Sequence, residues 1–292
     1  MLHSEFLQFF ITGITVGFTY ALIAIGFSII YNASDVVNFA QGEFVMMGAL
    51  STISLHSKGI PLPLAIIGGV AITALAGVFL EKLVVERAKG ASVINTAIIT
   101  IGASIFFRGL AMVIWGKGIY QMPHFSGETP LRILGATALP QHLWVIGGAI
   151  TLMVFFWYFF NQTLLGKAMR ACSYNKTAAS LVGIRVNTIL VSAYAISAAL
   201  GAISGVLIAP ISYMTYESGT MLGLKGFAAA ILGGMGSASG AVLGGLCLGL
   251  LESFSAGFIS SSYKDAVTFI IILLVLFFRP SGILGKKEAE RV

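Results

Sequence analysis

The chain has 292 residues, of which 57% are hydrophobic and 10% charged, with a mean hydropathy of +0.95. A soluble domain carries about a quarter charged residues, so this composition excludes an ordinary soluble protein and indicates a polytopic membrane protein. In such a protein the net charge of +6 reflects cytoplasmic loops rich in Lys and Arg, and we expect no nucleic-acid partner. Cys172 and Cys247 are too few for a disulfide framework or a metal cluster.

Uncharged runs longer than the roughly 20 residues needed to cross a bilayer recur along the chain, beginning with Phe6 to Ile30. They lack the alternation of apolar and polar residues that marks barrel strands. The first run is too long for the core of a signal peptide, and no Lys or Arg precedes it, so we expect no cleaved signal. We predict an all-α fold, a polytopic helix bundle forming one domain over residues 1–292, with about eight to nine spans. The predicted spans are 6–30, 38–56, 62–85, 93–115, 143–161, 188–209, 221–235, 240–257 and 265–279.

Basic residues gather in three segments, at 82–89, 167–185 and 279–291. All three fall on one side of the membrane if each predicted span crosses once, and the cytoplasmic side is the one enriched in Lys and Arg. We therefore expect the N-terminus outside and the C-terminus in the cytoplasm.

The stretch from Asp35 to Met47 places Asn38, Gln41 and Glu43 between two apolar runs. Polar groups at membrane depth are costly and usually face a bundle interior or an aqueous pathway. Asn38 and Gln41 have the N-cap to N3 spacing of a capping box, which predicts a helix that starts below the membrane surface. A broken or re-entrant helix near 35–47 is the functional interpretation, and an ordinary polar loop between two spans is the alternative.

Arg108 lies inside the predicted span 93–115 with no carboxylate nearby in sequence. It either pairs with Glu43 or Glu252 of a neighbouring helix or extends its side chain to the membrane interface.

The segment 163–186 is the most polar long connection on the basic side. Its small residues, which include Ala168, Ala171 and Gly183, suit a short cytoplasmic helix that docks a partner protein. A solvated charged loop is the alternative.

The segment 223–252 is rich in glycine, and several glycines repeat every four residues, a spacing that permits close contact between membrane helices. These are Gly236, Gly240 and Gly244, and then Gly245 and Gly249. Lys225 and Glu252 bracket this segment, so we expect a structural ion pair or two interfacial anchors.

Enzymatic chemistry finds no support in the sequence. The glycines from Gly234 to Gly240 do not have the spacing of a nucleotide loop, and no Walker A motif occurs. We also find no spacing typical of metal ligands and no nucleophile–base pair. We therefore expect no cofactor or metal, and any ATP that drives the protein binds to another polypeptide.

Several ordered stretches together resemble the permease subunits of bacterial branched-chain amino acid ABC transporters, the H subunits of the leucine/isoleucine/valine systems among them. The matching stretches are 20–31, 37–44, 163–171, 178–184, 223–245 and 263–285, which leave mainly the loop 116–142 unmatched. The family more often carries His at the position of Gln41, and Gln has no titratable group, so we expect no proton-linked chemistry there.

This resemblance implies an inner-membrane subunit that pairs with a second, related permease, two cytoplasmic ATPases and a periplasmic substrate-binding protein. It also implies that 163–186 couples the ATPases to the spans, with Gly166, Ala168, Arg170, Ala171 and Gly183 as candidate coupling residues. Asn38, Gln41 and Glu43 become candidates for shaping or gating the translocation path. The expected function is ATP-driven import of branched-chain amino acids by alternating access.

Two alternatives stay open at this point. Permeases for urea or short amides are similar in sequence, and an ion-coupled secondary transporter would use Asp35, Glu43 and Glu252 to bind ions. The secondary transporter should show an inverted repeat, and we find no clear one.

Overall fold

The structure is a computed structural model that describes residues 2–88, 92–127, 129–133 and 135–285. Helices dominate it, and their order follows the apolar runs of the sequence. The α-helices are α1 (Leu2–Ser34), α2 (Gln41–Ser57), α3 (Leu62–Leu80), α4 (Val93–Trp115), α5 (Pro140–Gln162), α6 (Leu164–Tyr174), α7 (Lys176–Leu181), α8 (Val186–Ile208), α9 (Ser218–Gly233), α10 (Ala238–Phe258) and α11 (Lys264–Phe278). A π-helical turn, η1 (Glu81–Val85), and a 3₁₀ turn, η2 (Glu86–Ala88), continue α3.

Local sequence explains where many of these helices begin. Side chains of Ser92, Thr163, Asn175 and Ser237 accept hydrogen bonds from backbone N–H groups in the first turns of α4, α6, α7 and α10. Such N-caps satisfy donors that have no partner within the helix. Prolines stand in the first turns of α3 and α5, where the missing N–H costs nothing.

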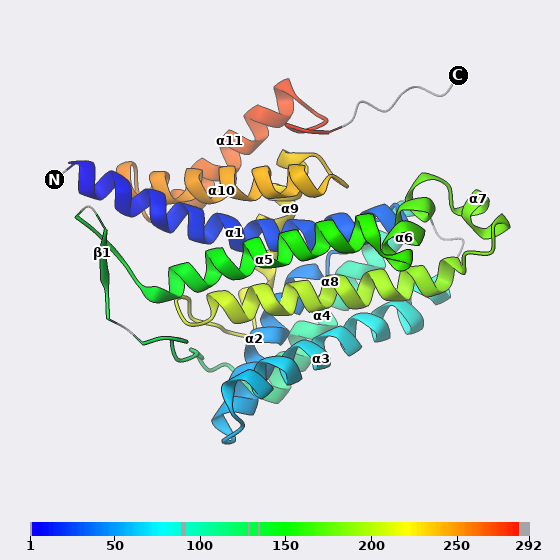
Figure 1. Ribbon diagram of the computed structural model, residues 1–292, viewed down its shortest axis with the longest axis horizontal. Coiled ribbons are helices and arrows are strands. Elements are labelled where there is room, and N and C mark those ends of the chain that lie inside the picture. Colours follow the sequence, from blue (N-terminus) through cyan, green and yellow to red (C-terminus); the bar gives the residue numbers. More distant parts are fainter. Residues whose placement is uncertain (1, 89–91, 128, 134, 286–292) are drawn as a thin grey trace.

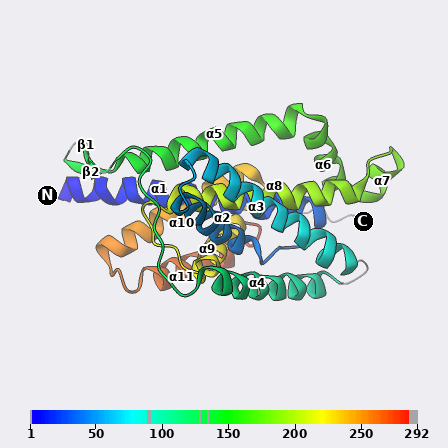
Figure 2. The ribbon, with the colours of Figure 1, turned by 90° about the horizontal axis from the view of Figure 1, so that it is seen from below.

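Figure 1 shows the long helices α1, α5, α8 and α10 running in a common direction. The N-terminus and the β1 strand lie at one end of this bundle, whereas α6 and α7 lie at the other. The basic turn that follows α3 lies toward the same end as α6 and α7 (Figure 2). Two of the three basic segments of the sequence therefore lie at one end of the molecule.

The interior of the bundle is built around α1, which packs on α10, α8, α9 and α5. The shorter helices α2 and α9 lie in the middle and are inclined to the direction of the long helices (Figure 1). α2 packs on α8, α3 and α9, and all of its residues from Gln41 to Thr52 are buried. In Figure 2, α5 lies on one side of this interior and α4 on the opposite side.

Each of the nine predicted spans coincides with an α-helix, and the fold is the predicted all-α bundle. The predicted count of about eight to nine spans is not confirmed, because six helical segments among the described residues are long and apolar enough to cross a membrane. α2, α9 and α11 have 17, 16 and 15 residues, fewer than the roughly 20 that a crossing needs. Whether these three cross in full stays a prediction.

The loop between α4 and α5 has structure that the sequence patterns did not predict. The strands β1 (Leu131–Ile133) and β2 (Ala136–Ala138) pair antiparallel within it. Tyr120 forms an antiparallel bridge with Met214 of the α8–α9 connection, with both backbone hydrogen bonds formed. The loop therefore covers that end of the bundle through backbone pairing as well as side-chain packing.

Candidate functional site

The chain between α1 and α2 returns into the bundle before the helix starts. Asn38 is fully buried, and its Oδ1 accepts a hydrogen bond from the Ala40 N–H at 3.1 Å. α2 begins at Gln41, with Ala40 at the N-cap position and no side-chain cap. The predicted capping box is therefore wrong, because Asn38 closes a turn with Ala40 just before the helix instead of capping the helix itself. The helix start inside the bundle agrees with the expectation.

Gln41 is held by α8 through its whole amide group. Its Nε2 donates to the Ser197 carbonyl at 3.1 Å, and its Oε1 accepts from Ser197 Oγ at 2.7 Å. The same hydroxyl lies 2.8 Å from the Gly26 carbonyl of α1. A side chain at Gly26 would overlap the Gln41 amide. Gln41 therefore joins α1, α2 and α8 through a neutral hydrogen-bond network that Ser197 completes.

Glu43 is a carboxylate in the centre of the bundle and is 1% exposed. Its Oε1 accepts hydrogen bonds from Ser104 Oγ of α4 at 2.9 Å and from Thr220 Oγ1 of α9 at 3.3 Å. Its Oε2 is buried and has no hydrogen-bond partner in the described part of the chain. One carboxylate oxygen is thus positioned by two neighbouring helices, while the other remains free to accept a hydrogen bond from a group outside the described residues.

Arg108 lies one turn after Ser104 on α4 and interacts electrostatically with the Glu43 carboxylate. The ion pairs found within 4.0 Å among the described residues join it neither to Glu43 nor to Glu252. Of the two predicted partners, Arg108 therefore lies near Glu43, but it does not form a direct ion pair with it. Opposite charges thus lie near each other where α2 and α4 meet, without a direct ion pair among the described residues.

Lys225 and Glu252 form the predicted ion pair, with Lys225 Nζ 2.7 Å from Glu252 Oε1. Three more side chains complete this group. Tyr20 donates to Glu252 Oε2 at 2.7 Å, Asp265 Oδ1 lies 2.8 Å from Lys225 Nζ, and Lys264 Nζ lies 3.2 Å from Glu252 Oε1. The cluster has two cations and two anions and ties α1, α9, α10 and the start of α11 together. Its balanced charge indicates a structural role.

The predicted coupling segment 163–186 forms α6, α7 and the turn into α8. Ala168 and Ala171 pack against the core of the bundle. A side chain at Gly166 would overlap the backbone of α5 at Phe159, so this glycine permits the tight turn between α5 and α6. Gly183 has a φ of 88° in the turn after α7, a conformation that favours glycine. The small residues thus shape the segment from within.

The outward side of the same segment carries large apolar side chains. Leu164, Tyr174, Leu181 and Val182 are strongly exposed there. In contrast, Cys172 is buried. Burial raises the pKa of its thiol, and the positive charge of Lys176 lowers that pKa by a smaller amount. Cys172 therefore serves as a neutral packing residue, and the surface of α6 and α7 is left to the larger apolar groups.

An ion pair connects this segment to the end of α1, where the chain turns toward α2. Lys176 Nζ lies 2.6 Å from Asp35 Oδ2 and donates to the Ser34 carbonyl at 2.8 Å. Asp35 has a φ of 63°, which ends α1 in the left-handed conformation common after helix C-termini. The lysine thus reaches the C-terminal end of α1, where a positive charge is favourable.

The glycines of α10 lie on two of its faces. Side chains at Gly240 and Gly244 would overlap the backbone of α9, whereas side chains at Gly245 and Gly249 would overlap the backbone of α1. Gly236 lies outside the helix, in the preceding turn with a φ of 84°. Gly236 therefore does not share a face of α10 with the other four glycines, because the four-residue repeat extends past the start of α10, although a side chain there would meet Asn32 of α1.

Several residues of these networks carried no signal in the sequence. Ser104, Thr220 and Ser197 are common small polar residues within apolar runs, and only their distance from Glu43 or Gln41 gives them a role. Asp265 and Lys264 lie in the first turn of α11 and could have been paired with Lys225 and Glu252 by charge alone.

Comparison with known proteins identifies the family. The family described as branched-chain amino acid transport system / permease component matches residues 9–276. The high-affinity branched-chain amino acid transport system permease protein LivH of Salmonella typhimurium is 33% identical, over 98% of this chain and 98% of that protein. The corresponding permease protein BraD of Pseudomonas aeruginosa is 34% identical, over 99% of this chain and 98% of that protein.

More distant proteins are also similar. The autoinducer 2 import system permease protein LsrC of Escherichia coli is 27% identical, over 88% of this chain and 75% of that protein. Among solved structures, PsaBC from Streptococcus pneumoniae in complex with Fab has a TM-score of 0.47 and 15% identity, over 96% of this chain and 92% of that chain. That likeness is too weak to support any conclusion.

The resemblance drawn from the sequence is thus confirmed by a family match that spans most of the chain and by identities above 30% over nearly its full length. The chain is a multi-pass inner-membrane transport subunit, not an enzyme, and it belongs to the family of permease components of branched-chain amino acid transport systems.

Proposed function

We propose that this chain is the permease subunit of an ATP-driven importer that carries branched-chain amino acids across the inner membrane by alternating access. The observation that carries the proposal is the near full-length similarity to high-affinity branched-chain amino acid permeases. In this proposal a second, related permease completes the translocation path, two ATPases bind on the cytoplasmic side, and a periplasmic protein delivers the substrate. The C-terminus lies in the cytoplasm.

The exposed apolar side chains of α6 and α7 support a docking surface for an ATPase. Leu164, Tyr174, Leu181 and Val182 lie at the end of the molecule where basic residues gather, and exposed apolar groups on a segment outside the membrane favour an interface. The Lys176–Asp35 contact would then transmit movement of the docked segment to the chain that leads into α2.

The buried polar residues of α2 support a place in or beside the path. Glu43 keeps one carboxylate oxygen without a partner in the described structure, and Arg108 lies near it without forming an ion pair. An amino acid carries an ammonium and a carboxylate, so two separated side chains of opposite charge match its head group. Asn38 and Gln41 hold the start of α2 in position, which places Glu43 between α4 and α9.

Exchange of Glu43 for Gln tests this part of the proposal. The amide keeps the shape and loses the charge, so we expect uptake of leucine by the assembled transporter to fall at least about tenfold, the value of one charge-assisted hydrogen bond. Because the exchange removes a buried charge, the melting temperature should not fall. Glu5→Gln, the same exchange at an exposed position, is the matched control. Wild-type uptake by Glu43→Gln would remove Glu43 from the path.

The class of transporter has its own test. We expect reconstituted chain to accumulate leucine only together with its ATPases and in the presence of ATP. Accumulation by the purified chain alone under an ion gradient would overturn the ATP-driven proposal and favour a secondary transporter.

A further inference from the structure

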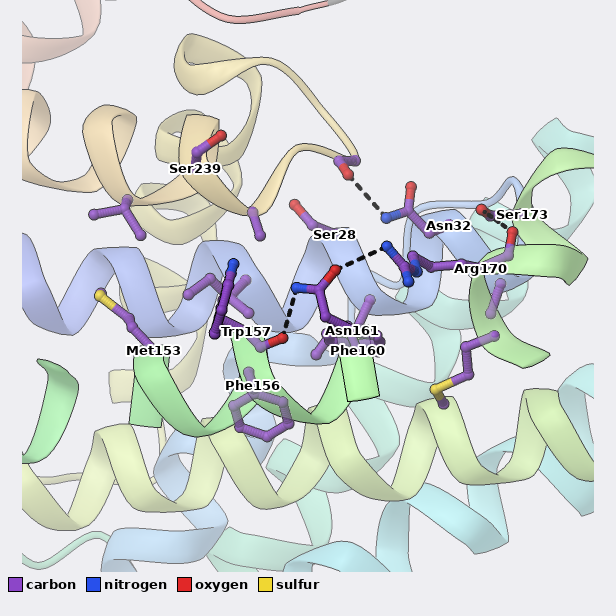
Figure 3. Close-up of a pocket in the computed structure, with 17 residues that line it drawn as sticks. Ser28, Asn32, Met153, Phe156, Trp157, Phe160, Asn161, Arg170, Ser173 and Ser239 are labelled. Carbon is purple, nitrogen blue, oxygen red and sulfur yellow. Dashed lines mark hydrogen bonds between the residues drawn. The ribbon is translucent and has the colours of Figure 1, made fainter. Parts of the chain in front are cut away.

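A pocket of about 370 Å³ lies between α1, α5, α6 and the N-terminus of α10 (Figure 3). Most of its wall is apolar. Ile25 and Ile29 of α1 and Met153, Phe156 and Trp157 of α5 line it. It lies on the α6 side of the molecule, so its polar end is at the end where basic residues gather.

The polar end of the pocket carries a positive charge. Arg170 Nη1 donates to Asn161 Oδ1 at 3.0 Å, and Asn161 Nδ2 donates to the Trp157 carbonyl at 2.7 Å. The amide is neutral, and the ion pairs found among the described residues do not include Arg170. Arg170 is also the one charged side chain among the described residues that line the pocket. Its charge is therefore available to an anion.

The N-terminus of α10 adds backbone donors at the same place. Gly236, Ala238 and Ser239 line the pocket. In the first turn of α10, the N–H group of Gly240 donates to Ser237 Oγ. The N–H groups of Ala238 and Ser239 have no acceptor within the helix. A helix N-terminus also carries partial positive charge and suits phosphate groups.

Ser28 supplies an independent indication of a ligand. Its side chain is 2% exposed, and its Oγ has no hydrogen-bond partner among the residues that the structure describes. Figure 3 shows the hydroxyl pointing from α1 toward α10. Buried hydroxyls are normally hydrogen-bonded, so this one is a donor that awaits an acceptor within the pocket.

We propose that this pocket binds an anionic phospholipid from the membrane leaflet on the side of α6. The guanidinium of Arg170, the start of α10 and the Ser28 hydroxyl would receive the phosphate, and the wall formed by α1 and α5 would hold hydrocarbon. Trp157, which lines the pocket, is 66% exposed and suits the boundary between acyl chains and head groups. A free amino acid fits less well, because no described lining residue offers a carboxylate to its ammonium.

The bound lipid would join α6 to α1 and α10 at the base of the segment that we propose to dock the ATPase. Basic residues near the membrane surface attract anionic lipids in general. Binding in this pocket should be more specific, because it should depend on Arg170 and on the start of α10 more than on net charge.

Native mass spectrometry of the purified full chain tests the proposal. The chain is incubated with phosphatidylglycerol or with phosphatidylcholine of identical acyl chains, and we expect preferential retention of phosphatidylglycerol. Arg170→Gln should weaken that retention about tenfold or more, since it removes a charge-assisted hydrogen bond. Lys167→Gln is the matched control, because Lys167 is an exposed cation on the same helix and does not line the pocket.

A second pair of variants guards against misfolding. Asp at Ser239 is compatible with the first turn of α10 and favoured by its dipole, yet it repels phosphate. We therefore expect Ser239→Asp to fold and to lose phosphatidylglycerol, whereas Ser239→Asn folds and retains it. Equal retention of the two lipids would overturn the proposal, as would equal losses in Arg170→Gln and Lys167→Gln. Finding the pocket filled by an ATPase segment in the assembled transporter, with no lipid present, would overturn it too.

Discussion

At the scale of single residues, the Glu252 carboxylate of α10 connects four helices through a hydrogen bond and ion pairs. It accepts a hydrogen bond from Tyr20 of α1 and contacts Lys225 of α9 and Lys264 of α11. Lys225 is 8% exposed and Glu252 is 6% exposed, so each is largely shielded from water and depends on its partners for polar contacts. A buried pair of this kind contributes little compared with apolar residues, but the loss of one partner is costly.

We therefore expect Lys225→Met to destabilise the chain by roughly 3 kcal/mol, because it leaves Glu252 and Asp265 with one cation between them. Thermal unfolding of the purified chain in detergent measures the effect. The double variant Lys225→Met/Glu252→Gln should recover most of the loss, since it restores charge balance. Lys58→Met, at an exposed position, serves as the control. A single variant as stable as this control would show that the cluster does not hold the helices together.

At the scale of elements, α10 is the helix that packs on two others through glycines. Gly240 and Gly244 permit close approach of α9, and Gly245 and Gly249 permit close approach of α1. Close backbone approach is a principal source of helix association in membranes, where lipid tails are as apolar as the side chains. The spacing of four residues places such glycines on one helical face, which explains why the sequence pattern predicted a packing surface.

Gly249→Ala should destabilise the isolated chain by about 1–3 kcal/mol, because the added methyl group overlaps the backbone of Gly17. Gly102→Ala on α4 is the matched control. Among the described residues, nothing outside the neighbouring part of α4 lies within 4 Å of the added methyl at Gly102, and alanine favours the helix by up to about 1 kcal/mol. We expect the two variants to shift the melting temperature in opposite directions. Equal effects would refute the claim of close contact between α1 and α10.

At the scale of the whole molecule, one exposed ion pair connects the predicted coupling segment to the buried centre. Lys176 of α7 contacts Asp35, and six residues later the chain starts α2 beside the Gln41 network. Asp35 is well exposed, so the pair contributes at most about 1 kcal/mol to stability. Its position suggests a mechanical role, because it is where movement of α6 and α7 can reach the segment that carries Asn38 and Glu43.

Removal of this pair should therefore uncouple transport while leaving stability nearly unchanged. In proteoliposomes of the assembled transporter, Lys176→Met and Asp35→Asn should each lower the leucine imported per ATP hydrolysed several-fold, with melting temperatures near that of the wild type. Asparagine tolerates the left-handed conformation at position 35. The double variant should be no worse than either single one if the two residues act as a pair. Unchanged coupling in all three would show that the link plays no part.

Much of the element structure could be predicted from hydrophobic runs, because lipid requires backbone hydrogen bonds to be satisfied within each segment. The ends of the helices were less certain. Asn38 has the residue type and spacing of a cap but closes a turn before α2, and Gly236 continues a helical repeat outside the helix. In both cases a local pattern is compatible with two backbone conformations, and the packing around the segment selects one.

The sequence by itself determined that this is a helical membrane protein with a basic end and polar residues within its apolar core, because these properties depend on composition and on order along the chain. Only the tertiary structure decided which polar groups meet. Glu43 lies 61 residues from Ser104 and 177 from Thr220, and Ser28 lies far in sequence from Arg170 and the start of α10. Contacts over such separations depend on how whole helices pack, and local sequence patterns do not determine that packing.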